Sequence, residues 1–252
     1  MATKHTYHTG TYSGKTLHVL STPASNIRLY NLKGTSSLIN SAYYGINGGF
    51  FSWDSNKALN IALSDGAAIG PGDVGTDNNW AGGGVISWNG VSVKFNAPIQ
   101  EMGKLDEDVR SGQSGTWAQG GHSMYLGNKN WLSKMYGDVL QTVDEHNPDL
   151  DKIVNNSSYR TGLVADKTTK MVHLVVTLSG CTFSTFRAAI QSYLGISDGS
   201  SDSTRYVGLF LDGSYSSQMK AKNTSNNVIT VANLDSGAYR KLHQIIVLRS
   251  AT

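Results

Sequence analysis

Two short segments combine glycine with polar side chains, and each follows an apolar run. They are Ile46–Phe51, which reads Ile-Asn-Gly-Gly-Phe-Phe, and Leu211–Ser217, which reads Leu-Asp-Gly-Ser-Tyr-Ser-Ser. Glycine lets the backbone take positive φ and lets a ligand approach the main chain closely, while the amide, carboxylate and hydroxyl groups beside it stay out of the core. We therefore expect the two segments to form two walls of one pocket.

Strands and turns are expected to position these segments. Apolar or alternating runs bounded by glycine, asparagine, aspartate or proline predict strands at residues 16–20, 27–30, 84–88, 91–95, 163–164, 171–178, 206–211, 228–232 and 244–248. The first two runs are predicted to pair across Pro23. Asn89-Gly90 favours a tight hairpin between 84–88 and 91–95, and the run at 171–178 is predicted to be a central, buried strand. Residues 53–79 are predicted to be mainly loop.

One helix is predicted over residues 182–194. Its apolar side chains recur at helical spacing, Thr182 or Ser184 would cap its start, and Gly195 would end it. With 28 glycines and only 15% charged residues, the rest of the chain favours strands and turns. We expect an α+β fold in which residues 1–252 form a single β-rich domain, with a mixed central sheet, several hairpins and few helices.

Composition and charge argue against several partners. The 21 basic and 18 acidic residues give a formal charge of +3, and the basic residues are scattered, so no nucleic acid polymer is expected to bind. No apolar stretch approaches the roughly 20 residues that span a bilayer, so no membrane partner is expected. The first 20 residues lack a secretory signal and predict a cytoplasmic protein; phage lysis or earlier processing are the alternatives.

No cofactor and no metal site are expected, and the sequence leaves a bound divalent ion as the alternative. Cys181 is the only cysteine, so a disulfide within the chain and a cysteine-rich zinc site are excluded. An acidic cluster runs through Asp144, Glu145, His146, Asp149 and Asp151, but its spacing favours a solvated loop or a frayed helix.

The order of the motifs resembles the phosphodiester glycosidase family. Asn-Gly-Gly-Phe-Phe at 47–51 comes first, Arg-Thr-Gly at 160–162 precedes a hairpin and a helix, and Leu-Asp-Gly-x-x-Ser-Ser-Gln-Met at 211–219 follows. The resemblance extends from about Leu17 to Leu248. It implies a hydrolase that cleaves a sugar from a glycosyl-1-phosphodiester at the anomeric C–O bond and leaves a phosphomonoester. The substrate would be a small-molecule or polymer glycosyl phosphodiester.

The resemblance also implies residue roles, with Asp212, Arg160 and Asn47 as the catalytic group. Arg160 would hold the phosphate with its planar, permanently charged fork. Asp212 would face the anomeric carbon, where a carboxylate can activate water, form a glycosyl intermediate or stabilise positive charge. Asn47 would bind sugar hydroxyls or orient Asp212. The expected substrate-binding residues are Gly48, Gly49, Gly213, Ser216, Ser217, Tyr215 and His122.

Two features leave other functions open. No second carboxylate is identified by a motif, and Asp54, Asp65 and Asp73 are equal candidates. In addition, Ser214 and Tyr215 stand where the family commonly has glycines, which would narrow the pocket or demand a different backbone conformation. The alternatives are a non-catalytic protein that sequesters a phosphorylated sugar or nucleotide-like molecule, and a carbohydrate-recognition part of a phage or wall-associated assembly.

Overall fold

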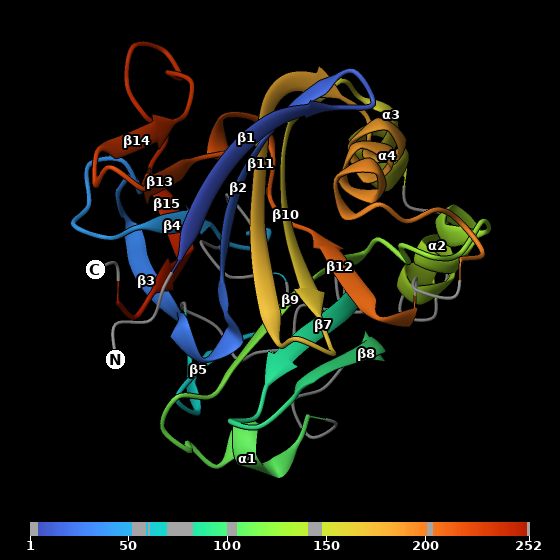
Figure 1. Cartoon of the computed structure of the whole chain (residues 1–252), viewed down its shortest axis with the longest axis horizontal. Coiled ribbons are helices and arrows are strands. Elements are labelled where there is room, and N and C mark those ends of the chain that lie inside the picture. Colours follow the sequence, from blue (N-terminus) through green and yellow to red (C-terminus); the bar gives the residue numbers. More distant parts are fainter. Residues whose placement is uncertain are drawn as a thin grey trace.

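The computed structural model describes residues 5–51, 59, 61–69, 83–99, 105–140, 148–200 and 204–250. Strands are the main regular structure of these residues, and they form two sheets (Figure 1). The predicted β-rich class is confirmed. The sheets are not mixed, however, because every strand pair among the described residues is antiparallel.

The larger sheet has β10 and β11 near its centre. Its order is β1 (Thr6–Tyr12), β2 (Lys15–Pro23), β11 (Met171–Cys181), β10 (Ser158–Asp166), β12 (Tyr206–Phe210), β9 (Trp117–Ser123), β5 (Ala62–Ser64) and β6 (Ala67–Ala68). β7 (Gly83–Trp88) also pairs with β9, and β8 (Val93–Ile99) pairs with β7. The predicted central hairpin, β10–β11, is therefore confirmed, as is the strand at β12.

The second sheet has five strands and contributes the first glycine segment. Its order is β14 (Val228–Val231), β13 (Met219–Lys222), β4 (Gly45–Asn47), β15 (Leu242–Leu248) and β3 (Ile27–Ser36). The predicted pairing across Pro23 is wrong, because β2 and β3 belong to different sheets and the short 3₁₀ helix η1 (Ala24–Asn26) joins them. β2 forms its hairpin with β1 instead, in a segment whose polar sequence gave no strand signal.

The helices are α1 (Glu107–Arg110), α2 (Trp131–Leu140), α3 (Pro148–Asn155) and α4 (Phe183–Leu194). α4 matches the predicted helix: the Thr182 hydroxyl accepts a hydrogen bond from the N–H of Thr185, and Gly195 ends the helix at φ 68°. α3 covers Asp149 and Asp151 of the acidic cluster, for which the sequence predicts a solvated loop or a frayed helix. No helix in the described part of the chain is long and apolar enough to cross a membrane.

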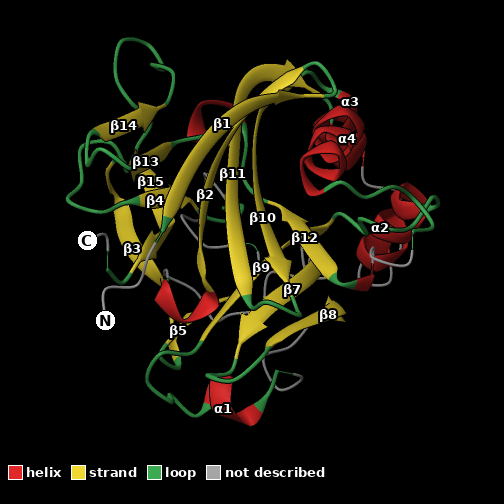
Figure 2. Cartoon of the chain, in the orientation of Figure 1, coloured by secondary structure: helices red, strands yellow, loops and turns green. Residues whose placement is uncertain are grey.

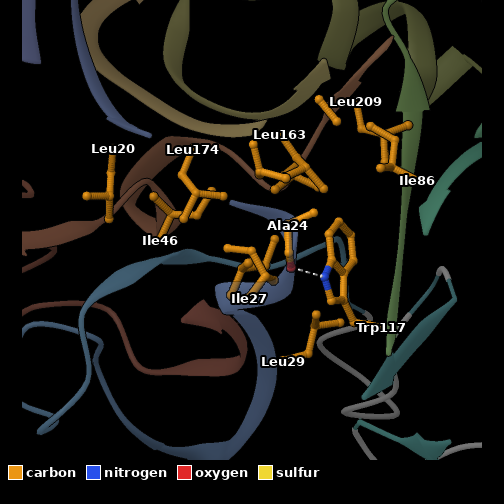
Figure 3. Packing of buried hydrophobic residues seen from close by; sticks show 14 of the residues in the cluster. Leu20, Ala24, Ile27, Leu29, Ile46, Ile86, Trp117, Leu163, Leu174 and Leu209 are labelled. Carbon is orange, nitrogen blue, oxygen red and sulfur yellow. Dashed lines mark hydrogen bonds between the residues drawn. The ribbon is translucent and has the colours of Figure 1, made fainter. Parts of the chain in front are cut away.

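The larger sheet is covered on both faces (Figures 1 and 2). One core cluster packs it against the smaller sheet and includes Leu163, Leu174 and Ile46; in it Trp117 Nε1 donates to the Ala24 carbonyl at 2.8 Å (Figure 3). A second cluster includes Val164 of β10 and residues of α2, α3 and α4. Successive residues of β10 thus face opposite cores, which explains the continuous apolar run in its sequence.

Candidate functional site

The two glycine segments lie side by side, held by main-chain hydrogen bonds. The N–H of Asp212 donates to the carbonyl of Gly48 at 3.3 Å, and the N–H of Leu211 donates to the carbonyl of Thr161 at 3.0 Å. The end of β4, the end of β12 and the start of β10 therefore converge. This junction joins the two sheets at the edge of the α3–α4 layer.

A cavity of about 340 Å³ opens at this junction. Both glycine segments contribute to it, as expected, together with residues of β10 and α3. Its lining residues are Phe50, Phe51, Leu59, Ile153, Asn156, Ser158, Arg160, Asp212, Gly213 and Ser214. The cavity is lined by apolar side chains, a few polar groups, one guanidinium and one carboxyl group, which is the usual character of a small-molecule site.

Arg160 is 5% exposed and is fixed by the protein main chain. Its Nε donates to the Cys181 carbonyl at 3.0 Å, Nη2 donates to the carbonyls of Ile153 (2.9 Å) and Asn156, and the guanidinium carbon lies 4.7 Å from the centre of the Phe183 ring. Among the described residues, Nη1 has no hydrogen-bond acceptor. Burial lowers the pKa of Arg160 to about 10, so it stays charged at neutral pH. The side chain is thus a rigid cation with one donor group left for a ligand.

β10 is irregular where it presents this arginine. The pairing between β10 and β11 shifts register between Ser158 and Arg160. Such bulges turn a side chain away from its regular direction and are common beside functional sites.

Asp212 is the carboxylate of the cavity, and it is half-buried. Desolvation raises its pKa to about 6. The Ser216 hydroxyl, the N–H of Gly213 and the charges of Arg240 and Arg160 oppose this shift by favouring the ionised form. The Gly213 N–H lies 2.8 Å from Asp212 Oδ1. A carboxyl group with this pKa can hold or release a proton near neutral pH, which suits acid–base chemistry.

Asn47 holds the two segments together. Its Nδ2 donates to the main-chain carbonyl of Asp212 at 2.8 Å, and its Oδ1 accepts from the Thr161 hydroxyl (2.8 Å) and the Gln218 N–H (3.2 Å). Asn47 is 1% exposed and does not line the cavity. Of the two expected roles, this geometry fits orientation of Asp212; direct contact with sugar hydroxyls is not what it offers.

Gly48 and Gly49 allow close packing, and their N–H groups donate hydrogen bonds within the protein. The Gly48 N–H donates to the Gln244 carbonyl at 2.9 Å, and the Gly49 N–H donates to Gln244 Oε1 at 3.1 Å. A Cβ on Gly48 would lie 2.5 Å from Gln244 Cδ, and one on Gly49 would lie 2.8 Å from Gln119 Nε2. The expectation that these N–H groups bind substrate is therefore corrected: they donate within the protein, and glycine lets the backbone pass close to two buried glutamines.

In the second segment, Gly213 and Ser214 line the cavity while the following serines are buried. A Cβ on Gly213 would lie 2.8 Å from the Tyr159 carbonyl oxygen, so this position requires glycine. Ser214 has φ 57°, the left-handed conformation that glycine adopts more easily. Ser217 is 1% exposed and its hydroxyl lies 3.1 Å from that of Thr161. Ser217 is therefore a structural residue, and Ser216 is fully buried and does not line the cavity.

Tyr215 and His122 do not line the cavity. The Tyr215 ring stands edge-on to Tyr159 with centroids 5.9 Å apart, and the Arg240 guanidinium lies 5.5 Å from its centre. His122 is 1% exposed and packs against Phe50, a lining residue, at 4.9 Å between ring centroids. Burial lowers the His122 pKa to about 4 and keeps the ring neutral. His122 therefore supports the wall of the cavity, which corrects its predicted contact with substrate.

The described residues supply no second carboxylate to the cavity. Asp65 lies elsewhere, where its Oδ1 accepts from Arg249 (2.8 Å) and from the Gly115 N–H (2.6 Å). Asp54 and Asp73 lie outside the described residues. So do Asp144, Glu145, His146 and the side chain of Asp149, whereas Asp151 accepts a hydrogen bond from Tyr136. No group of three or more metal-ligating side chains occurs in the part of the chain that the structure describes.

Asn156 and Ser158 are polar lining residues that sequence reasoning missed. They stand just before Arg160 in the chain, but nothing in their types or spacing marks them. Thr161 was likewise not singled out, although its hydroxyl contacts both Asn47 and Ser217.

No protein-family model and no curated protein matches the sequence. The crystal structure of a hypothetical protein from Synechocystis is similar in fold, with a TM-score of 0.53 and 12% identical residues. The match covers 98% of this chain and 62% of that chain, so this chain spans less than two thirds of its neighbour. At this identity the likeness concerns the fold alone.

Proposed function

We propose that this protein hydrolyses a glycosyl-1-phosphodiester at the anomeric C–O bond. The observation that carries the proposal is one cavity lined by both the fixed guanidinium of Arg160 and the carboxyl group of Asp212, whose pKa is raised to about 6. The guanidinium would bind the phosphate oxygens through Nη1, and the carboxyl group would face the sugar. Phe50 and Phe51 offer apolar surface for the sugar ring.

The proposed reaction transfers the sugar to water. As the bond between the anomeric carbon and the phosphate oxygen breaks, the phosphodiester leaves as a phosphomonoester and its growing negative charge is stabilised by Arg160. Asp212, ionised for most of the time at pH 7, stabilises the positive charge on the sugar or removes a proton from the attacking water. A phosphate leaving group needs little protonation, so one carboxyl group can suffice.

A panel of sugar-1-phosphodiesters tests this function. Purified protein is incubated with each compound, and free sugar and phosphomonoester are measured. We expect at least one compound to be cleaved, and Asp212→Asn to abolish the cleavage. Asp108→Asn is the matched control, because Asp108 is an exposed aspartate outside the cavity. Cleavage that persists in Asp212→Asn would contradict the proposal.

A second candidate function is binding without turnover, and one observation favours it. Glycosidases usually use two carboxylates, and Asp212 is the only acidic side chain among the described lining residues. A phosphorylated sugar or nucleotide-like molecule would then be held by Arg160 and released unchanged. Retention of a sugar phosphate with no product, in both the original protein and Asp212→Asn, would support this function.

A further inference from the structure

A second cavity, of about 330 Å³, lies at the opposite end of β10 and β12. The first cavity is at the start of β10 and just past the end of β12. The second is lined by Lys167, just past the end of β10, and by Tyr206, at the start of β12. Gly208, the last β12 residue that lines the second cavity, lies four residues before Asp212 of the first, a separation of roughly 13 Å along an extended strand. They are distinct sites.

Three aromatic side chains form the walls of the second cavity. They are Phe95, Tyr125 and Tyr206. The rings of Phe95 and Tyr125 meet edge to face at 89°, with centroids 6.2 Å apart. The Tyr125 hydroxyl donates to Asp138 Oδ2 at 2.6 Å, which fixes the ring. Rigid aromatic walls around a hollow offer apolar contact to a ring-shaped ligand at little entropic cost.

Lys167 is the one charged side chain among the described residues that line this cavity. Among the described residues, no carboxylate pairs with the ammonium group of Lys167. Nearby Asp166 is already neutralised by Arg205, whose Nε lies 2.8 Å from its Oδ1. Asp138 is 6% exposed and accepts the Tyr125 hydroxyl. The ammonium of Lys167 is therefore left to attract an anionic group.

The backbone at this cavity is strained. Tyr125 has φ 44°, which is unfavourable for a residue with a bulky side chain. Its carbonyl accepts from the Asn128 N–H at 2.9 Å, and its hydroxyl bond to Asp138 holds the other end. Strain maintained by such fixed contacts is concentrated at functional sites. Here it keeps the Tyr125 ring on the wall of the cavity.

We propose that this cavity is a second ligand site, which binds a small molecule that combines a ring with a phosphate or similar anionic group. The ring lies among Phe95, Tyr125 and Tyr206, and the anion lies on Lys167. The site does not depend on the function proposed for the first cavity. A sugar phosphate and a nucleotide share this chemistry, and the experiment separates them.

Isothermal titration calorimetry of the full chain tests the proposal. Two matched pairs of probes are used: glucose 6-phosphate with glucose, and uridine 5′-monophosphate with uridine. We expect one phosphorylated probe to bind and its uncharged partner to bind at least about tenfold more weakly. Lys167→Gln should weaken that binding about tenfold. Thr204→Trp, which places a large ring at an exposed lining position, should abolish it.

Two controls make the test specific. Lys170→Gln changes an exposed lysine in the same turn that does not line the cavity, and it should leave binding unchanged. Arg160→Lys should also leave it unchanged, because a probe held in the first cavity would respond to Arg160 and not to Lys167. Circular dichroism checks that each variant is folded. The proposal is overturned if no phosphorylated probe shows binding that Lys167→Gln weakens, or if Lys170→Gln weakens it equally.

Discussion

Asp212 and Arg160 line one cavity, and partial removal from water disfavours the charge of both. Desolvation raises the pKa of Asp212 to about 6 and lowers that of Arg160 to about 10. Their mutual attraction favours the charged form of each. Both charges are therefore costly in the folded protein, and a charged ligand with complementary groups would stabilise them.

At the residue scale, Asp212→Asn is expected to stabilise the protein at neutral pH. The folded pKa is above the unfolded value of 3.8, so the folded state binds more protons between about pH 4 and 6, and stability falls as pH rises through that window. The uncharged amide avoids this loss. We expect a gain of about 1 to 2 kcal/mol at pH 7 that vanishes towards pH 4, measured by urea unfolding.

The control for this stability change is again Asp108→Asn, at an exposed position. Its effect should stay within about 0.5 kcal/mol at both pH values. A loss of stability in Asp212→Asn at pH 7 would mean that the folded protein stabilises the ionised carboxylate, contrary to its raised pKa.

Arg160→Lys should lower kcat/KM at least about tenfold although it keeps the charge. The guanidinium uses Nε and Nη2 to bind main-chain carbonyls, which leaves Nη1 for a ligand in the cavity that Arg160 lines. A single ammonium group cannot do both. Arg110→Lys, at an exposed arginine of α1, is the matched control and should leave kcat/KM unchanged. Equal kinetics for the two variants would exclude Arg160 as the anion-binding group.

At the scale of elements, the turn after β12 departs from the glycine-rich sequence that its shape favours. Ser214 has φ 57° and is the first residue of the 3₁₀ helix η4 (Ser214–Ser216). Ser214→Gly should relieve the strained conformation. The greater freedom of glycine in the unfolded chain offsets part of this gain.

We expect Ser214→Gly to raise stability by about 0.5 kcal/mol, measured as an increase in the urea midpoint. Ser197→Gly is the comparison, because Ser197 is exposed and does not have positive φ. It should lower stability instead. The same sign for both substitutions would show that the turn at Ser214 is not strained.

Elements with strong local signals could be predicted from the sequence. α4 has an N-cap, helical spacing and a terminal glycine, and β10–β11 has apolar runs around a polar turn. The β7–β8 hairpin was also predicted, but its loop is longer than expected: Trp88 pairs with Val93, and Asn89 Oδ1 accepts from the N–H groups of Val91 and Ser92. The asparagine side chain thus builds a wider turn than the Asn-Gly pair alone predicts.

At the scale of the whole molecule, a buried glutamine pair joins the two sheets behind the cavity. Gln244 of β15 donates to Gln119 of β9, and Gln244 Oε1 accepts from the Gly49 N–H at 3.1 Å. This contact fixes the segment that carries Phe50 and Phe51. It also explains why the roles of Gly48 and Gly49 could not be predicted, since their glutamine neighbours lie far away in sequence.

Gln244→Met should cost about 2 kcal/mol of stability, because it leaves the buried Gly49 N–H and Gln119 without their partner. The similar length of methionine keeps the packing volume. Urea unfolding measures the loss, and Gln113→Met at an exposed position should change stability little. A neutral Gln244→Met would show that the two sheets do not depend on this contact.

The order of the motifs predicts that their segments meet at one site, but it does not predict which residues line the cavity and which support its walls. Arg160 and Asp212 do share a cavity, whereas Asn47, Gly48, Gly49, Ser217 and His122 hold its walls. A polar residue beside a glycine looks the same in sequence whether it faces a ligand or another sheet. Only the packing of the two sheets distinguishes these cases.

A sugar-1-phosphodiester that the protein cleaves is hydrolysed in ¹⁸O-labelled water, and the position of the label shows which bond breaks. The same reaction with Asp212→Asn shows whether Asp212 takes part. Attack at the anomeric carbon places the label in the released sugar and leaves the phosphomonoester unlabelled, and this is the result we predict, with no product from Asp212→Asn. Label in the phosphomonoester, or the same labelled sugar at the same rate from Asp212→Asn, would contradict it.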